Sequence, residues 1–274
     1  MKNVLIPTDF SKSAELAAKY GVEIAKQLNS GVTFLHIIST PVEWKKIPLE
    51  KESLYPETKA AIGSAKDALF KLERMAENQG VDACTSLIFN TGIEEIPKYI
   101  SKNSYNLVVM GTHGQKGIDK VMGTNTLKVI NRSTVPVLAV KLTDRHSLPK
   151  NWVLVSDFQD ESREKFETLL ELAQGLQAHI QVLYVNTPYY FLESGDIQDK
   201  MEGFLSTMPK DRVKRNIINA RNEERGIENF LKSCECDLVA VVTHGRSGLL
   251  PLFRRSMSER LINHLTIPVL SLNT

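Results

Sequence analysis

Two short segments, each following an apolar run, carry residue types that could bind a phosphorylated ligand. Residues 3–7 lead into Thr8-Asp9-Phe10-Ser11, and residues 107–110 lead into a glycine-rich segment that reaches the helical stretch 124–132. Glycines allow the backbone to approach a ligand closely, and free N–H groups at the start of a helix favour a phosphate. We therefore expect a nucleotide site with its base near Asp9 and its phosphates on the glycine loop. The loop residues concerned are Gly111, Gly114, Gly123, Thr124 and Asn125.

The same glycines have a plainer interpretation, because glycines after a strand are also common turn residues. The loop lacks the Gly-Lys-Ser/Thr ending of a Walker A phosphate loop, and it does not match the Gly-x-Gly-x-x-Gly dinucleotide motif. The residue types taken alone leave binding and turn formation both open.

The elements that must position these segments alternate along the chain. Short runs rich in Val, Ile and Leu predict strands, and longer stretches of helical period predict helices, the first with Ser11 as its N-cap. In the first half, strands are expected at 3–7, 32–38, 85–89, 107–110 and 137–140, and helices at 12–29, 57–80, 93–102 and 124–132. Continuously apolar strands between helices indicate a parallel sheet covered on both faces. Ligands of such sheets bind beyond the carboxyl ends of strands, where the winding direction reverses.

The order of these signals occurs twice, which makes the chain a tandem repeat. Residues 4–10 return at 153–158, and residues 106–114 return at 237–245. Strands of the second half are expected at 152–155, 180–185, 213–219, 238–242 and 268–272, with a short second helix within 193–206. We predict two domains, 1–142 and 151–274, that pack on each other across a short polar linker.

Several landmarks of the first half resemble a universal stress protein domain. They are Pro7-Thr8-Asp9-Phe10-Ser11, Phe34-Leu35-His36-Ile37, Met110-Gly111-Thr112-His113-Gly114, Gly123-Thr124 and Val135-Pro136-Val137. The resemblance covers essentially the whole chain as a tandem pair. It implies an α/β fold of two tandem doubly wound domains, each a five-stranded parallel sheet in the order 3-2-1-4-5 with helices on both faces. The winding then reverses between strands one and four.

The resemblance also implies which residues of the first repeat hold an adenine nucleotide, ATP or AMP. Asp9 and Ile37 would hold the adenine end. The ribose and phosphates would lie on Gly111, Gly114, Gly123, Thr124 and Asn125, and Pro7, Thr8 and Met110 are further binding candidates. ATP-binding members read Gly-x2-Gly-x9-Gly-Ser/Thr, whereas eight residues separate Gly114 from Gly123 here, so the phosphate cradle must be tighter. Mg²⁺ could accompany ATP, but the sequence shows no metal site of its own.

The second repeat keeps the nine-residue spacing and loses two key glycines. Val242 stands at the first glycine, Gly245 is retained, and Arg255-Ser256 replaces Gly-Ser/Thr. Side chains at 242 and 255 would fill space that the ribose and phosphates need. We predict that the second domain binds no ATP in the family manner. Arg254 and Arg255 either attract another anion or are solvated charges, and the latter is the simpler interpretation.

Two histidines could be proposed as acid–base groups. His113 and His244 occupy equivalent positions after the fourth strand of each repeat. No partner nucleophile stands at a recognisable spacing, which favours a hydrogen bond that orders the loop over a catalytic role. His36 lies inside an apolar run, so a hydrogen-bonded core histidine is expected there.

The remaining polar clusters also favour structural roles. Zinc at Cys234-x-Cys236 would require two further ligands at suitable spacing, and none is evident, so packing is expected. The cluster Arg212-x-Lys214-Arg215 flanks a predicted strand and is more typical of a charged sheet edge than of a nucleic-acid surface.

Composition excludes several classes of protein. The chain has 274 residues, 42% hydrophobic and 24% charged, which is ordinary for a globular protein and not for a disordered or membrane-embedded one. Its net charge of +2 argues against a dedicated nucleic-acid binder. Three cysteines do not suggest a disulfide framework, and no apolar segment has the length of a signal or membrane-spanning region. We expect a cytoplasmic protein with no membrane partner.

Three classes of function stay open. In the first, an adenine nucleotide in domain 1 regulates the conformation or assembly of the protein; a role in stress response is what the resemblance implies. The second is a scaffold that binds protein partners and no nucleotide. The third class, an enzyme acting on phosphate, has the least support, because no carboxylate pair stands near the loop. No catalytic residue is expected, and weak ATP hydrolysis is left open. The resemblance further implies pairing through strand five, as a pseudo-dimer within the chain, a homodimer being compatible.

Overall fold

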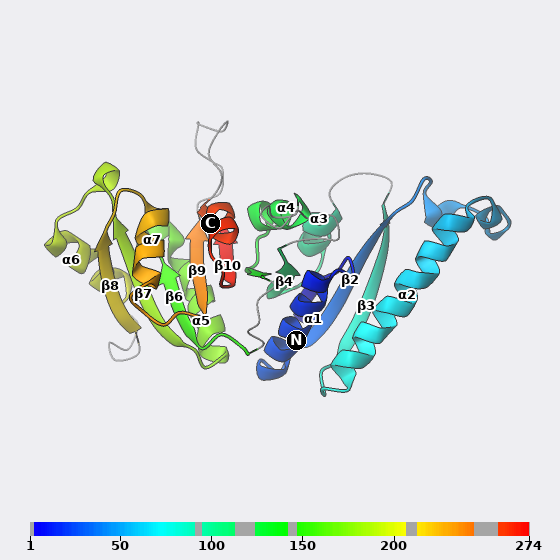
Figure 1. Ribbon diagram of the computed structural model, residues 1–274, viewed down its shortest axis with the longest axis horizontal. Helices are drawn as coiled ribbons and strands as arrows, with labels where there is room; N and C mark the ends of the chain where they lie inside the picture. The colour runs from blue at the N-terminus through cyan, green and yellow to red at the C-terminus, as the bar shows by residue number, and fades with distance from the viewer. Residues whose placement is uncertain are drawn as a thin grey trace. The chain divides into compact units, whose positions relative to one another are not determined.

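The computed structural model describes residues 3–90, 95–112, 124–141, 147–206, 213–243 and 257–273 (Figure 1). The chain divides into two compact units, Met1–Val129 with Val140–Leu142 and Ile130–Ala139 with Thr143–Thr274. Within the described residues, no helix combines the length and the apolar character needed to cross a membrane.

The first repeat alternates strands and helices as the apolar pattern predicts. Its strands are β1 Asn3–Pro7, β2 Gly31–Ser39, β3 Ala83–Asn90, β4 Leu107–Gly111 and β5 Val137–Val140. Its helices are α1 Lys12–Gln27, α2 Pro56–Glu77, α3 Glu95–Lys102 and α4 Thr124–Arg132. In the first unit β1 lies between β2 and β4, and β3 pairs with β2, all in parallel. The N–H of Thr112 donates to the carbonyl of Val140 at 3.1 Å, so the order 3-2-1-4-5 is kept.

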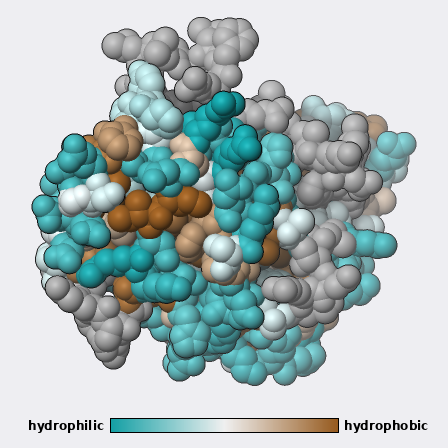
Figure 2. Space-filling model, turned by 60° about the vertical axis from the view of Figure 1, so that its left-hand side comes forward, coloured by the Kyte–Doolittle hydropathy of each residue, from teal (hydrophilic) through white to brown (hydrophobic). Residues whose placement is uncertain are grey.

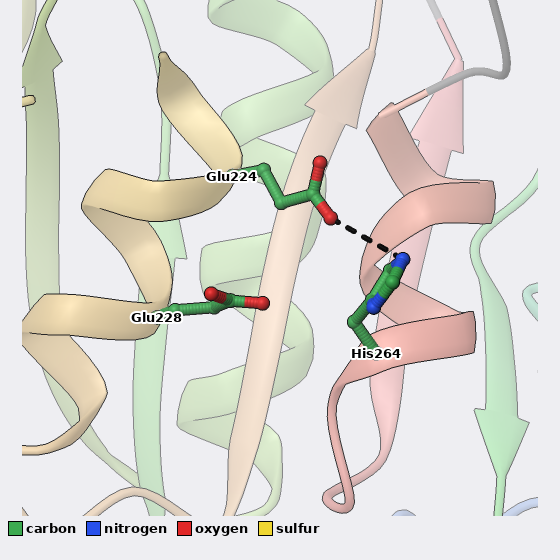
Figure 3. A group of neighbouring side chains, drawn as sticks. All are labelled: Glu224, Glu228 and His264. Carbon is green, nitrogen blue, oxygen red and sulfur yellow. Dashed lines mark ion pairs between the residues drawn. The ribbon is translucent and has the colours of Figure 1, made fainter. Parts of the chain in front are cut away.

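The second repeat builds the same sheet. Its strands are β6 Asn151–Val155, β7 His179–Asn186, β8 Val213–Asn219, β9 Leu238–Thr243 and β10 Val269–Asn273. Its helices are α5 Arg163–Gly175, α6 Ser194–Phe204, α7 Glu223–Leu231 and α8 Met257–His264. Parallel pairs give the order β8-β7-β6-β9-β10. α7 and α8 lie on one face of this sheet and α5 on the other (Figure 3). The predicted class, two doubly wound α/β repeats in tandem, is confirmed.

Residues 137–139 of β5 fall in the second unit, although the strand belongs to the first repeat in sequence. It pairs antiparallel with β10, and Leu138 lies opposite Leu270. The side-chain amide of Asn273 donates to the carbonyl of Ile130, which lies near the end of α4. These contacts explain why Ile130–Ala139 belongs to the second unit.

Helix α1 shows how the sequence determines an element. Ser11 accepts the Ala14 N–H with its side-chain oxygen at 3.3 Å and so caps the helix. Four of the ten buried residues of this helix are alanines, and these small side chains bring the helix axis close to the sheet. A Cβ on Gly21 would overlap Cδ1 of Ile6, so the helix approaches β1 most closely there. The helix ends at Gln27, two residues before the predicted end, because Asn29 adopts a positive φ of 49°.

The connection after β2 differs from the expectation. Between the strand predicted at 32–38 and the helix predicted at 57–80 the sequence analysis places no regular element, whereas the structure has two 3₁₀ helices, η1 Trp44–Lys46 and η2 Leu49–Leu54. Trp44 is buried in a small core with Ile38, Ile62 and Ala65. Helices of three and six residues are too short for a periodic pattern, so composition alone does not reveal them.

Candidate functional site

The carboxyl ends of β1, β2 and β4 meet at one edge of the first sheet. Pro7, the last residue of β1, pairs with Leu35, and Leu5 pairs with Val108 in β4. Continuing these registers puts Asp9 level with Ile37 and Pro7 level with Met110. Strand order reverses here between β1 and β4, which is where ligands of open α/β sheets bind.

A tight turn follows β1 and fixes the position of Asp9. The Phe10 N–H donates to the Thr8 hydroxyl oxygen at 3.0 Å, and the Ser11 N–H donates to Oδ1 of Asp9 at 3.1 Å. Phe10 has a φ of 61°, a backbone conformation that residues other than glycine seldom adopt. The two side-chain acceptors satisfy the N–H groups of this turn, and Asp9 is held half-buried at the sheet edge.

His36 supports the turn from the neighbouring strand. Its Nδ1 lies 2.7 Å from the carbonyl oxygen of Thr8, and its ring lies 4.4 Å from the ring of Phe10. The Thr8 N–H in turn donates to the carbonyl of Leu35 at 2.8 Å. The expected hydrogen bond is confirmed, but His36 is half-buried at the sheet edge and not in the core. The role of this side chain is to hold Thr8 and Phe10.

Gly111 has a packing reason of its own. A Cβ on this residue would lie 2.7 Å from the carbonyl carbon and oxygen of Ser13, in the first turn of α1. Its carbonyl accepts a hydrogen bond from the Thr126 hydroxyl at 3.0 Å, which ties β4 to α4. Only a residue without a side chain fits between β4 and α1.

The residues that the sequence analysis singled out fall into four groups. Asp9, Ile37 and Gly111 are half-buried and lie at the edge, whereas Pro7, Thr8 and Met110 are buried, so their side chains face the core. Thr124 and Asn125 begin α4. Residues outside the described ranges are Gly114, Gly123, His113, His244, Gly245, Arg254, Arg255, Ser256 and Arg212.

The second repeat forms the same turn at the end of β6. The Phe158 N–H donates to the Ser156 hydroxyl oxygen at 2.9 Å, the Gln159 N–H donates to Oδ1 of Asp157 at 3.2 Å, and Phe158 has a φ of 52°. Since Val155 pairs with Leu183 as Pro7 pairs with Leu35, Tyr184 stands in the place of His36.

Aromatic side chains fill the space around this second turn. Phe158 is 3% exposed, and its ring lies 5.3 Å from Phe204 of α6, 6.0 Å from Phe166 and 6.2 Å from Tyr184. Burial, with a smaller contribution from the charge of Asp157, raises the pKa of Tyr184. The corresponding edge of the second unit is thus occupied by the protein's own side chains.

The cysteine pair behaves as a packing element. The Cys236 thiol donates to the carbonyl of Leu238 at 3.1 Å, and burial raises its pKa to about 12. Burial raises the pKa of Cys234 as well. Such thiols stay protonated near neutral pH, and thiolates are the form that binds metal.

One cluster in the second unit was missed by the sequence analysis. Glu224 and Glu228 of α7 and His264 of α8 place their ligand atoms within 4.8 Å of one another (Figure 3). Two glutamates four residues apart on a helix were a weak signal of a shared face. The contribution of His264 depends on the packing of α8 beside α7, which no local pattern encodes.

The chain is a tandem α/β protein. Each of its two doubly wound repeats has an edge at which the strand order reverses. The sequence model of the universal stress protein family matches residues 1–141 and 150–272. The chain therefore belongs to the universal stress protein family.

Individual relatives agree with this assignment. A universal stress protein of Methanocaldococcus jannaschii is 32% identical over 142 residues, which cover 51% of this chain and 82% of that protein. One from Mycobacterium bovis is 21% identical and covers 97% of this chain and 95% of its own length. The crystal structure of a universal stress protein from Archaeoglobus fulgidus has the same fold, with a TM-score of 0.75 at 18% identity over 99% of this chain and 98% of that one.

Proposed function

We propose that the first repeat binds an adenine nucleotide, ATP or AMP, and that the bound nucleotide regulates the protein in a stress response. The observation that carries the proposal is the position of Asp9, Ile37 and Gly111 together at the edge where the strand order reverses between β1 and β4. Asp9 and Ile37 would contact the adenine end. This edge keeps half-buried polar and backbone groups, which the corresponding edge of the second repeat replaces with aromatic side chains.

The phosphate end is proposed from the family pattern. Gly114 and Gly123 would let the backbone approach the phosphates, and α4, which begins at Thr124, would present free N–H groups to them. Asn125 would lie beside Thr124 in this first turn, and Mg²⁺ would accompany ATP. Pro7, Thr8 and Met110 have buried side chains, so we assign them a supporting role beneath the ligand.

The proposed role is regulation by binding. Adenine nucleotide in the domain of residues 1–142 would change the conformation or assembly of the chain, with the domain of residues 151–274 as its structural partner. The pairing of β5 with β10 is compatible with a pseudo-dimer within the chain. A cytoplasmic location and a further homodimer stay predictions.

The first experiment measures nucleotide that the protein carries. Freshly purified protein is denatured without added nucleotide, and the adenine nucleotides released per chain are quantified by mass spectrometry. About one per chain is expected. The emptied protein is then titrated with ATP, and binding is measured by fluorescence in a Trp152→Phe variant, where Trp44 is the one tryptophan left. Trp44 should respond to the ligand because Phe10, next to Asp9, packs against the core that contains Trp44.

Matched variants locate the site. Asp9→Asn keeps an oxygen that can accept the Ser11 N–H, so the turn survives while the adenine contact changes, and ATP affinity should fall. Asp157→Asn makes the same change in the second turn and should leave affinity unchanged. Equal effects of the two variants, or none from Asp9→Asn and Gly123→Val together, would contradict the assignment.

A protein-interaction scaffold is the second candidate, favoured by exposed apolar side chains. In the second unit, Tyr189, Tyr190 and Phe191 are 84%, 68% and 65% exposed in the segment after β7. Figure 2 shows hydrophobic residues among hydrophilic ones on the face that this view presents. If no nucleotide is released or bound, the scaffold becomes the leading function.

A further inference from the structure

Three side chains of the second unit converge on one point between two helices (Figure 3). Glu224 and Glu228 stand four residues apart on α7 and therefore share one face of that helix. His264 is the last residue of α8, and its Nε2 lies 3.5 Å from Oε1 of Glu224. One ligand atom from each of the three residues lies within 4.8 Å of the others.

The chemistry of this set favours a transition metal. Imidazole and carboxylate are both common ligands of Zn²⁺, whereas Mg²⁺ and Ca²⁺ prefer oxygen ligands alone. With Zn–N and Zn–O distances of about 2.0–2.2 Å, ligand atoms of a tetrahedral site lie roughly 3.4 Å apart. The atoms here must move closer by about an ångström, and the His264 side chain, 56% exposed, is able to move.

A neighbouring arginine holds one of the ligands. Nε of Arg260 lies 3.8 Å from Oε2 of Glu224, on the other oxygen from the one that faces His264. That Nε is buried and makes no hydrogen bond among the described residues, so the carboxylate is its nearby counter-charge. Groups that hold a ligating carboxylate in place strengthen a metal site. Two carboxylates against one guanidinium leave negative charge that attracts a cation.

We propose that Glu224, Glu228 and His264 bind one divalent transition-metal ion, with Zn²⁺ the best match. Three protein ligands leave a fourth position for water or for a donor from another molecule. Because two ligands come from α7 and one from α8, the bound ion links the two helices across one face of the second sheet. This site is separate from the proposed nucleotide edge and does not depend on it.

The test is an isothermal calorimetric titration with ZnCl₂. The full chain is first freed of metal by a chelator. We expect one site per chain that is weakened at least about tenfold in both Glu228→Gln and His264→Gln. His179→Gln is the matched control, since His179 is exposed in the same unit outside the cluster. The Zn²⁺ affinity of this variant should equal that of the unchanged protein. Saturating Zn²⁺ should raise the melting temperature of the second unit in the unchanged protein and not in the two variants.

Two further results decide the proposal. All variants are first melted in the presence of chelator, where equal melting temperatures show that they fold alike. Excess Mg²⁺ or Ca²⁺ should not displace Zn²⁺. Absence of saturable Zn²⁺ binding would overturn the proposal and leave a plain ion-pair cluster. Binding that survives in both variants but is lost in Cys234→Ser would also overturn it, by assigning the ion to thiols.

Discussion

The two repeats end their first strands with the same turn and use the space around it differently. The Thr8 hydroxyl accepts the Phe10 N–H, and the Ser156 hydroxyl accepts the equivalent Phe158 N–H. Phe10 and Phe158 both have positive φ. Around the first turn lie His36 and a glycine at 111; around the second lie three aromatic rings and Val242. The turn is therefore a requirement of the fold and no evidence of a ligand. What distinguishes a candidate site is the set of residues that surround it.

The largest expected difference concerns the two phenylalanines. Phe158→Ala should destabilise the second unit by about 3–5 kcal/mol, because it empties a fully packed aromatic cluster. Phe10→Ala should cost the first unit clearly less, since Phe10 is only half-buried. Urea unfolding followed by fluorescence measures each unit separately, with Trp152 alone in a Trp44→Phe background and Trp44 alone in a Trp152→Phe background. Equal losses would remove the proposed difference between the two edges.

Exchanging the residues after the fourth strands tests the role of glycine. Gly111→Val introduces a Cβ against backbone atoms of Ser13 and should destabilise the first unit by about 1–3 kcal/mol. The reverse change, Val242→Gly, should cost the second unit roughly 1 kcal/mol through backbone entropy. The same fluorescence-detected unfolding measures both. An unaffected Gly111→Val protein would mean that α1 shifts to accept the side chain.

Tyr184 should make the stability of the second unit depend on pH. Burial raises the pKa of Tyr184 in the folded protein above its unfolded value of about 10. The stability linked to the neutral phenol is therefore fully present below about pH 10 and is lost as pH rises through the higher folded value. Tyr184→Phe should reduce the fall in unfolding free energy between about pH 8 and pH 11. A fall of the same size in both proteins would show that other groups cause it.

The smallest effects test the shared turn. Thr8→Val and Ser156→Ala each remove a side-chain acceptor from a backbone N–H and should cost about 1 kcal/mol in their own units. Similar losses in the two units would support equivalence of the turns. A loss confined to one unit would show that the other turn is held by its packing.

Much of the fold could be predicted because apolar runs and helical periods are local signals. β1, α4 and β5 were predicted at the bounds observed, and the N-cap at Ser11 was confirmed. The core around Trp44 could not be predicted in this way, because a 3₁₀ turn has no sequence period. The arrangement of β5 with β10 required the family resemblance, since no local pattern specifies an antiparallel partner in another repeat.

The candidate site likewise has features that could be predicted from the sequence and features that could not. Asp9 and Ile37 could be placed at one edge, because the carboxyl ends of parallel strands meet there. The reason for Gly111 could not be predicted, since it depends on Ser13 of α1, which lies close only in the folded unit. Glu224 and His264 likewise meet through helix packing, forty positions apart in sequence.

The pairing of β5 with β10 has a consequence for biosynthesis. The hydrogen bond between Asn273 and Ile130 spans 143 residues, which a ribosome needs roughly 7–30 s to add. During that interval β5 has left the exit tunnel while β10 does not yet exist, so its outer edge has unpaired N–H and C=O groups. A nascent chain on a neighbouring ribosome presents the same edge, and such edges pair readily. Slowed translation between the repeats should therefore increase entanglement of chains on one messenger RNA.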